Sequence, residues 1–199
     1  MKKKLPIRRY KLDEQGMMGV YAVSLVDEPA IMVDWVALAA QNKVKLSSVN
    51  EERQMLYGPL LIPDQLIYRR DDKTGEEWYN TYDKELIRQT AHRYLKMNLH
   101  HNATVMHELQ VAGCTVVESW LKEYDNDKSV GLGFELPIGT WFVGMHVQDA
   151  ALWDEVKKGT FKGFSIEAFF QQSGEEQMSK MHSELIADLN KISEELSKL

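Results

Sequence analysis

Two residues, a histidine and a serine, could together perform nucleophilic catalysis. His107 lies in the segment VMHE at 105–108, and Ser165 lies in KGFSIEA at 162–168. A serine hydroxyl is a weak nucleophile until an imidazole within hydrogen-bonding reach accepts its proton. Ser165 is a small polar residue in an apolar segment, after a glycine that permits close backbone approach. The pair predicts serine hydrolase chemistry if the fold brings the side chains together. Taken singly, each is more typical of a hydrogen-bonded structural residue.

A carboxylate could orient the histidine, and two glutamates are candidates for this role. Glu167 follows Ser165 by two residues, so both side chains lie on one face of an extended strand. Glu118 lies on the strand that leaves His107. A carboxylate in a mostly apolar strand needs a partner, which a histidine would supply. The alternatives are a surface or salt-bridged glutamate in each case, and a serine–histidine dyad completed by water or by the backbone.

Other kinds of catalytic site have less support in the sequence. His100 and His101 are adjacent, so on a strand they would face opposite sides, and together with His107 and His146 they show no short-range zinc spacing. Cys114 is the single cysteine and lies in an apolar run, which indicates a buried thiol and excludes an intramolecular disulfide. A glycine-rich phosphate loop and a dinucleotide fingerprint are also missing. We therefore expect no metal ion and no cofactor.

Composition limits the classes of partner that the protein can bind. The chain has 199 residues and a net charge of −6. This acidic balance argues against general nucleic-acid binding, although the basic start at 2–11 could touch phosphates or acidic partners. No stretch of the sequence approaches the ~20 apolar residues that a membrane-spanning helix needs. We expect a cytosolic protein with no membrane partner and no specific nucleic-acid partner.

Hydrophobic patterning predicts an N-terminal arm and connection at 1–52, a β-rich body at 53–171, and a hinge with an amphipathic helix at 172–199. Asp83 is a good N-cap for a helix that runs to about residue 96. Asp149 begins a shorter helix that ends at Gly159. Strands are expected at 19–26, 34–40, 55–62, 66–69, 78–82, 103–108, 111–121, 140–147 and 161–170.

The C-terminal segment has the spacing of a coiled-coil helix. Its apolar residues recur every three or four positions. They are Met178, Met181, Leu185, Leu189, Ile192, Leu196 and Leu199. A helix of nearly three heptads is marginal alone, so its apolar side needs a partner. That partner could be the body of the same chain, a second copy in a homodimer, or another protein.

Several short segments occur in an order and spacing that match a known family. They are YGPLLIPD at 57–64, AHRYL at 91–95, MH at 106–107, VVESW at 116–120, GTWFVG at 139–144, WDEVKKG at 153–159 and GFSIE at 163–167. Over 56–170 the sequence resembles the phage serine proteases of the XkdF type, which are relatives of the prohead proteases. The resemblance implies an α+β, herpesvirus-assemblin-like fold, in which a β-barrel-like body is flanked by helices.

The resemblance also implies roles for individual residues. It carries the base onto His107 and the nucleophile onto Ser165, on an earlier and a later strand. Families of this fold place the third catalytic residue, a histidine or a carboxylate, after the serine. The residues of these types that follow Ser165 closely are Glu167, Glu175, Glu176 and His182. Glu118 stays a candidate because it lies inside one of the matching segments.

The function implied by the resemblance is that of a serine endopeptidase of phage head maturation. Such an enzyme would act inside the immature head, in the host cytoplasm, on the scaffold protein, on the arm of the major capsid protein and on itself. The competing hypothesis is a non-catalytic scaffold or core protein of the prohead with the same fold, which the coiled-coil segment favours. A metal-dependent hydrolase, a third hypothesis, would require a bound metal ion.

Overall fold

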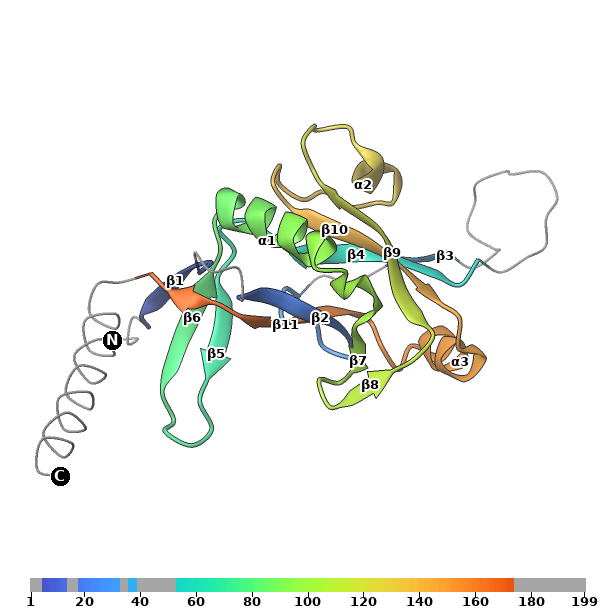
Figure 1. Ribbon diagram of the computed structural model, residues 1–199, viewed down its shortest axis with the longest axis horizontal. Coiled ribbons are helices and arrows are strands. Elements are labelled where there is room, and N and C mark those ends of the chain that lie inside the picture. The colour runs from blue at the N-terminus through green and yellow to red at the C-terminus, as the bar shows by residue number, and fades with distance from the viewer. Residues whose placement is uncertain (1–4, 14–17, 33–35, 39–52, 174–199) are drawn as a thin grey trace, which may run out of the picture.

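The computed structural model describes residues 5–13, 18–32, 36–38 and 53–173, which are mostly strands with few helices (Figure 1). The strands are β1 (Ile7–Lys11), β2 (Gly19–Val26), β3 (Val36–Leu38), β4 (Met55–Leu61), β5 (Ile67–Arg70), β6 (Glu77–Thr81), β7 (Ala103–Val105), β8 (Leu109–Val111), β9 (Cys114–Leu121), β10 (Trp141–Val147), β11 (Gly163–Phe169) and β12 (Gln171–Gln172). The helices are α1 (Lys84–Lys96), the 3-10 turn η1 (Leu99–His101), α2 (Lys128–Gly131) and α3 (Ala150–Lys158). The predicted α+β class is confirmed.

The described strands form three four-stranded sheets and do not close into a barrel. Their orders are β12-β1-β6-β5, β3-β4-β10-β9 and β11-β2-β7-β8. A barrel requires strand pairing all the way round a ring. Here each sheet ends in strands that have only one neighbour, such as β5, β9 and β8. The prediction of a barrel-like body is therefore wrong for this part of the chain, although helices do flank the sheets.

The core is built from the sheet that contains β10, the sheet that contains β2, and helix α1. Trp141, Val143 and Met145 of β10 are completely buried. Tyr94 of α1 packs edge-on against Trp141, with ring centroids 5.5 Å apart. Each large apolar side chain buried in this way contributes about 1.5–3 kcal/mol to stability. As the sequence predicts, the Asp83 side chain begins α1 by accepting a hydrogen bond from the backbone N–H of Leu86 at 2.8 Å.

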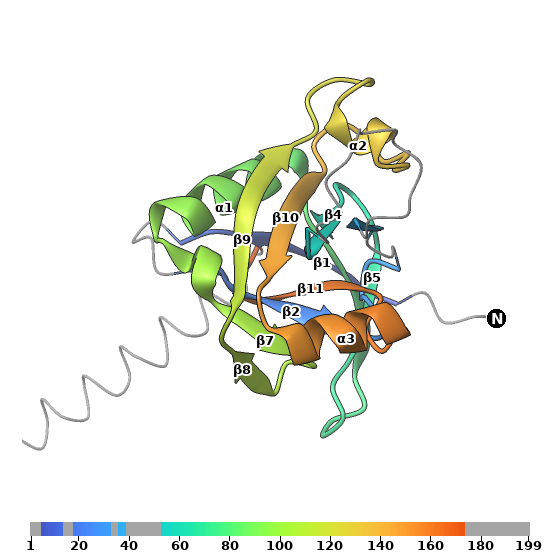
Figure 2. The same cartoon turned by 90° about the vertical axis from the view of Figure 1, so that its right-hand side faces the viewer.

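Two smaller helices lie at opposite ends of the β9–β10 pair (Figure 2). Near one end is α3, which begins at its predicted cap Asp149 and ends at Gly159, whose left-handed backbone favours glycine. Near the other end is the one-turn helix α2. No helix in the described ranges is long and apolar enough to span a membrane.

The sheet β11-β2-β7-β8 contains the predicted catalytic residues or leads directly to them. Strand β2 lies at its centre, antiparallel to β11 and parallel to β7. Val23 and Leu25 of β2 are completely buried and belong to the main apolar core. Although β2 falls in the segment predicted as an N-terminal arm, its pairing makes it part of the same sheet as β11. The predicted division of the chain at residues 52 and 171 stays a prediction.

Several local predictions differ from the structure. The strand expected at 103–108 ends at Val105, and the strand expected at 111–121 is divided by a turn at Gly113, whose φ is +78°. Strands β1 and β12 were not predicted, and they pair with each other through Tyr10 and Gln172. The amphipathic helix predicted at 178–199, with its partners, lies outside the described residues.

Candidate active site

Ser165 lies in the middle of β11 with its side chain directed away from the main core. Its neighbour Phe164 is 1% exposed and packs in that core. Because successive side chains of a strand point to opposite faces, Ser165 and Glu167 share the other face of the sheet. Ser165 is only 8% exposed. The hydroxyl therefore lies in a largely desolvated position.

The neighbouring strand β2 places small side chains beside these two residues. Ser24 pairs with Ser165, and Ala22 pairs with Glu167. On its other side, Ser24 pairs with Thr104 of β7. Because Ala22 and Ser24 are short, the Glu167 carboxylate reaches across β2 and accepts a hydrogen bond from the Thr104 hydroxyl. One face of the sheet thus carries a continuous row of polar groups over three strands.

His107 follows β7 in a tight turn toward β8. Both Met106 and His107 have left-handed backbone conformations, with φ of 52° and 60°. Non-glycine residues adopt this conformation rarely, and it is often found at functional sites. The turn is held to β2 by two hydrogen bonds. The N–H of Met106 donates to the Leu25 carbonyl at 3.0 Å, and the N–H of His107 donates to the Ser24 hydroxyl at 3.0 Å.

The side chain of His107 lies beside Glu167. Its Nδ1 is 3.4 Å from Oε1 of Glu167, at the distance of an ion pair when the imidazole is protonated. The carboxylate is the more buried partner, with its side chain 15% exposed against 43% for the imidazole. A carboxylate at Nδ1 leaves Nε2 as the nitrogen that can exchange a proton with a substrate or a nucleophile.

Ser165 lies on a strand of this sheet, but His107 does not, although the sequence predicted both residues on strands. Strand β2 lies between them, and His107 stands in the turn that follows β7. Both contact Ser24, one as its cross-strand partner and the other through its backbone N–H. Within the described ranges, the Ser165 and His107 side chains are not hydrogen-bonded to each other.

Glu118, the other predicted orienting carboxylate, lies in a different sheet. It pairs with Gly144 of β10, and Tyr57 of β4 pairs with the same glycine from the far side. The Tyr57 hydroxyl donates to Oε1 of Glu118 at 2.5 Å, and Lys128 donates to Oε2. Partial burial alone would raise the pKa of Glu118, but these two hydrogen bonds outweigh it and lower the pKa. The structure brings Glu167 to His107, and it gives Glu118 other partners.

A comparison with known protein families identifies a matching family. Residues 43–173 match the family described as "Putative phage serine protease XkdF", and the matched region contains both His107 and Ser165. The chain belongs to this family. The same comparisons found no match among the curated proteins and none among the solved structures. The catalytic roles of His107, Ser165, Glu118 and Glu167 in this family member stay predictions.

Sequence reasoning missed three residues that adjoin the candidate site of this family member. Ser24 and Thr104 contact His107 and Glu167 respectively. Tyr21 lies close enough to Glu167 that, besides burial, the charge of the carboxylate and a hydrogen bond to it raise the pKa of the phenol. The only signal in the sequence is a serine inside the apolar strand β2. The matched region begins at residue 43, so it does not include that strand.

Two further expectations concern cysteine and metal sites. Cys114 is buried, as the sequence predicts, and burial raises the pKa of its thiol to about 11. In the part of the chain that the structure describes, no group of three or more His, Cys, Asp or Glu side chains is arranged to hold a metal ion.

Proposed function

We propose that this family member is a serine endopeptidase of phage head maturation, with Ser165 as nucleophile, His107 as general base and Glu167 as the group that orients the base. The observation that carries this proposal is the position of Glu167. It contacts Nδ1 of His107 and lies on the same strand face as Ser165. A carboxylate at Nδ1 and a serine on the same face are the elements of a serine–histidine–carboxylate site.

In this mechanism, His107 Nε2 accepts the Ser165 proton while Oγ bonds to the carbonyl carbon of the scissile peptide. The imidazolium then gives that proton to the leaving amine as the carbon–nitrogen bond breaks, which leaves an acyl-enzyme ester. Water adds to the ester with His107 again as base, and the imidazolium returns that proton to Oγ as the carbon–Oγ bond breaks and the carboxylic acid is released. Glu167 stabilises the imidazolium that forms in each half of the reaction.

The proposal is compatible with the lack of a hydrogen bond between Ser165 and His107. Catalytic hydrogen bonds are often long or absent until substrate is bound. The His107 turn is attached to β2 by two backbone N–H groups, and the imidazole is nearly half exposed. A rotation of this side chain over Ser24 is the movement that the mechanism requires.

The proposed substrates are the scaffold protein, the arm of the major capsid protein and the protease itself, inside the immature head. The test is co-expression of the protease with the scaffold and capsid proteins of its own phage, followed by mass spectrometry of new chain ends. Wild type should generate defined ends that are missing with Ser165→Ala. Identical chain ends with both proteases would contradict the proposal.

The separation of Ser165 from His107 by β2 favours one second candidate, a non-catalytic prohead assembly protein. On this hypothesis, the polar row on the sheet serves stability only. The same co-expression separates the two, because an assembly protein would support head formation equally well with serine or alanine at position 165. Uncleaved but normally formed heads with both versions would favour it.

A further inference from the structure

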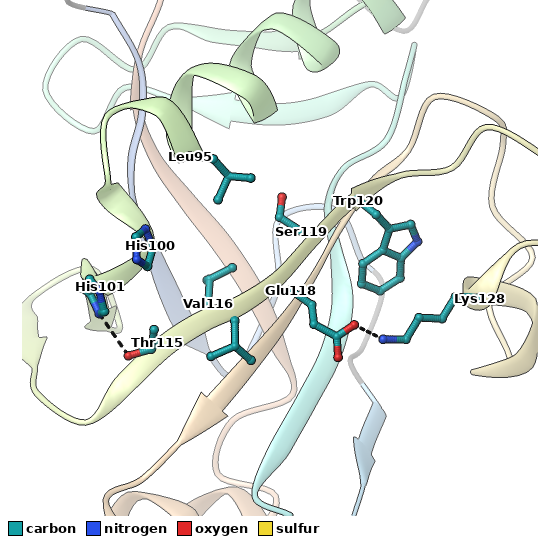
Figure 3. Close-up of a pocket in the computed structure, with 10 residues that line it drawn as sticks. Leu95, His100, His101, Thr115, Val116, Glu118, Ser119, Trp120 and Lys128 are labelled. Atoms are coloured by element: carbon teal, nitrogen blue, oxygen red, sulfur yellow. Dashed lines mark hydrogen bonds and ion pairs between the residues drawn. The ribbon is translucent and has the colours of Figure 1, made fainter.

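Strand β9 has one backbone edge without a partner strand. It is the last strand of the sheet β3-β4-β10-β9, and in the described ranges only β10 pairs with it. A groove of about 910 Å³ follows this strand and is lined by the six successive residues 115–120 (Figure 3). Successive side chains point to opposite faces, so a groove lined by all of them follows the backbone edge itself. Such an edge presents unpaired N–H and C=O groups.

Helical elements form the two walls of the groove. On one side are Leu95 from the last turn of α1 and the histidines His100 and His101 of η1. On the other side, Lys128 of α2 points toward the strand (Figure 3). The middle of the groove is apolar, because Leu95 is 42% exposed and Val117 is 53% exposed. These exposed apolar side chains lie beside the unpaired edge.

At the Lys128 end of the groove, the group that can still form hydrogen bonds is the positively charged amine of Lys128. Both oxygens of Glu118 already accept hydrogen bonds, one from Tyr57 and one from Lys128. Lys128 has three donors and uses one of them on a described residue, while its charge lies 4.3 Å and 5.0 Å from the ring centroids of Tyr57 and Trp120. A carboxylate brought to this end would find free donors there.

We propose that the edge of β9 binds an extended segment of the substrate polypeptide as an added strand, away from the scissile bond. The segment would have apolar side chains in its middle and an acidic side chain at the Lys128 end. This proposal rests on the proposed endopeptidase function, and it adds a docking site to it. Backbone hydrogen bonds would supply affinity, and the side-chain contacts would supply selectivity. Ser165, His107 and Glu167 do not line this groove.

The walls of the groove favour a single strand over a second copy of the chain. A two-fold pairing of β9 with β9 would bring the α1, η1 and α2 walls of each copy against those of the other, because both walls stand along the same edge. A single added strand avoids this clash, because it occupies only the space between the two walls. Six residues of strand are about 20 Å long, enough for several inter-strand hydrogen bonds.

The test uses the full chain with Ser165→Ala, so that binding is measured without cleavage. The probe is a synthetic blocked decapeptide of valine, threonine and serine with one glutamate near one end. Its matched control has the same side chains but an N-methyl group on each central residue, which removes the backbone donors of both edges. Hydrogen exchange of the amides at 115–120 is followed with each peptide. The proposal predicts slower exchange of alternate amides with the first peptide and no change with the second.

Variants at the groove sharpen the test. Leu95→Lys, which adds a charge to the apolar middle, should weaken binding of the decapeptide at least tenfold. Met97→Lys is the matched control, because Met97 is 48% exposed near the same end of α1 but outside the groove. Lys128→Gln should weaken binding up to about fivefold for the glutamate peptide and leave its glutamine analogue unaffected, as expected for an exposed ion pair.

The outcomes separate this proposal from the proposed function. If the peptide protects the β9 amides but the wild-type chain cleaves no head protein, the docking site is supported and the endopeptidase function is contradicted. Specific cleavage of head proteins by the wild type, with unchanged β9 exchange and equal binding by Leu95→Lys and Met97→Lys, would overturn the docking site alone. Equal protection by the N-methylated peptide would also overturn it, since strand addition requires the backbone donors.

Discussion

The Nδ1 atom of His107 and the Oε1 atom of Glu167 lie 3.4 Å apart although sixty residues of sequence separate them. The contact depends on β2, which lies between the strand of Glu167 and the turn of His107. Glu167 extends from β11 over the short side chains of β2, and the left-handed turn after β7 directs His107 back toward it. Because Glu167, and not Glu118, contacts His107, we expect substitutions of the two glutamates to affect the reaction rate differently.

Replacing Glu167 with glutamine should slow catalysis by about 100- to 10,000-fold, because a neutral amide cannot stabilise the imidazolium of His107. The measurement is the rate of cleavage of a head-protein substrate, together with the melting temperature as a check on folding. Glu108→Gln is the matched control, since Glu108 is an exposed carboxylate next to His107.

The alternative third residue is tested with a small ester substrate, and Glu167→Gln is measured with the same ester for comparison. Glu118→Gln should keep the rate of reaction with a small serine-directed ester within a few-fold of wild type, because its partners are Tyr57 and Lys128. A loss with Glu118→Gln as large as that with Glu167→Gln would contradict the assignment of Glu167.

Ser24→Ala should lower kcat about tenfold with little change in KM, because it removes the hydroxyl that accepts from the backbone N–H of His107. It should also destabilise the fold by about 0.5–1.5 kcal/mol, the usual net value of such a hydrogen bond. Thr90→Ala is the control. It removes a buried hydroxyl that bonds to the Leu86 carbonyl within α1. Equal effects of both variants on kcat would show that Ser24 has a purely structural role.

Gly144→Ala should destabilise the protein by about 1–3 kcal/mol, the usual cost of overpacking. A Cβ atom at this position would lie 2.6 Å from a ring carbon of Tyr57 and 3.1 Å from Cβ of Glu118. Chemical unfolding measures the change in the free energy of unfolding. Gly131→Ala serves as the control, because a Cβ atom there meets nothing within 4 Å. Equal stabilities of the two variants would contradict the close approach across β10.

Cys114 should resist alkylation by iodoacetamide at pH 8 in the folded protein. The thiol is 2% exposed, and burial raises its pKa to about 11. At that pKa roughly one thiol in a thousand is ionised at pH 8, and the thiolate is the reactive form. Intact mass spectrometry should show one added group only after unfolding. Rapid modification of the native chain would show that the thiol is accessible.

Local sequence patterns predicted the elements whose signals are themselves local. Asp83 and Asp149 begin their helices as predicted, since an N-cap acts on backbone groups two or three residues away. The apolar run at 19–26 correctly predicted β2. The pairing of β2 with β11 and β7 could not be predicted from local patterns, because it depends on contacts between segments distant in sequence.

The sequence indicated which residues could form the candidate site, but it did not predict how they are arranged in space. The two-residue spacing of Ser165 and Glu167 correctly placed both on one face of β11. His107 was expected on a strand because its neighbours are apolar or β-branched. In the structure, the N–H of Glu108 donates to the Val105 carbonyl and closes a turn instead. Ser24 was visible only as a serine inside an apolar strand, because its role depends on a residue 83 positions later.

The proposed mechanism makes Ser165 a nucleophile that His107 activates. Covalent labelling of the full chain by a fluorophosphonate tests this, with the modified residue located by peptide mass spectrometry. We expect labelling of wild type at Ser165, loss of that label in Ser165→Ala, and labelling at least 100-fold slower in His107→Ala. Labelling elsewhere, or equal labelling of wild type and Ser165→Ala, would show that Ser165 is not the nucleophile.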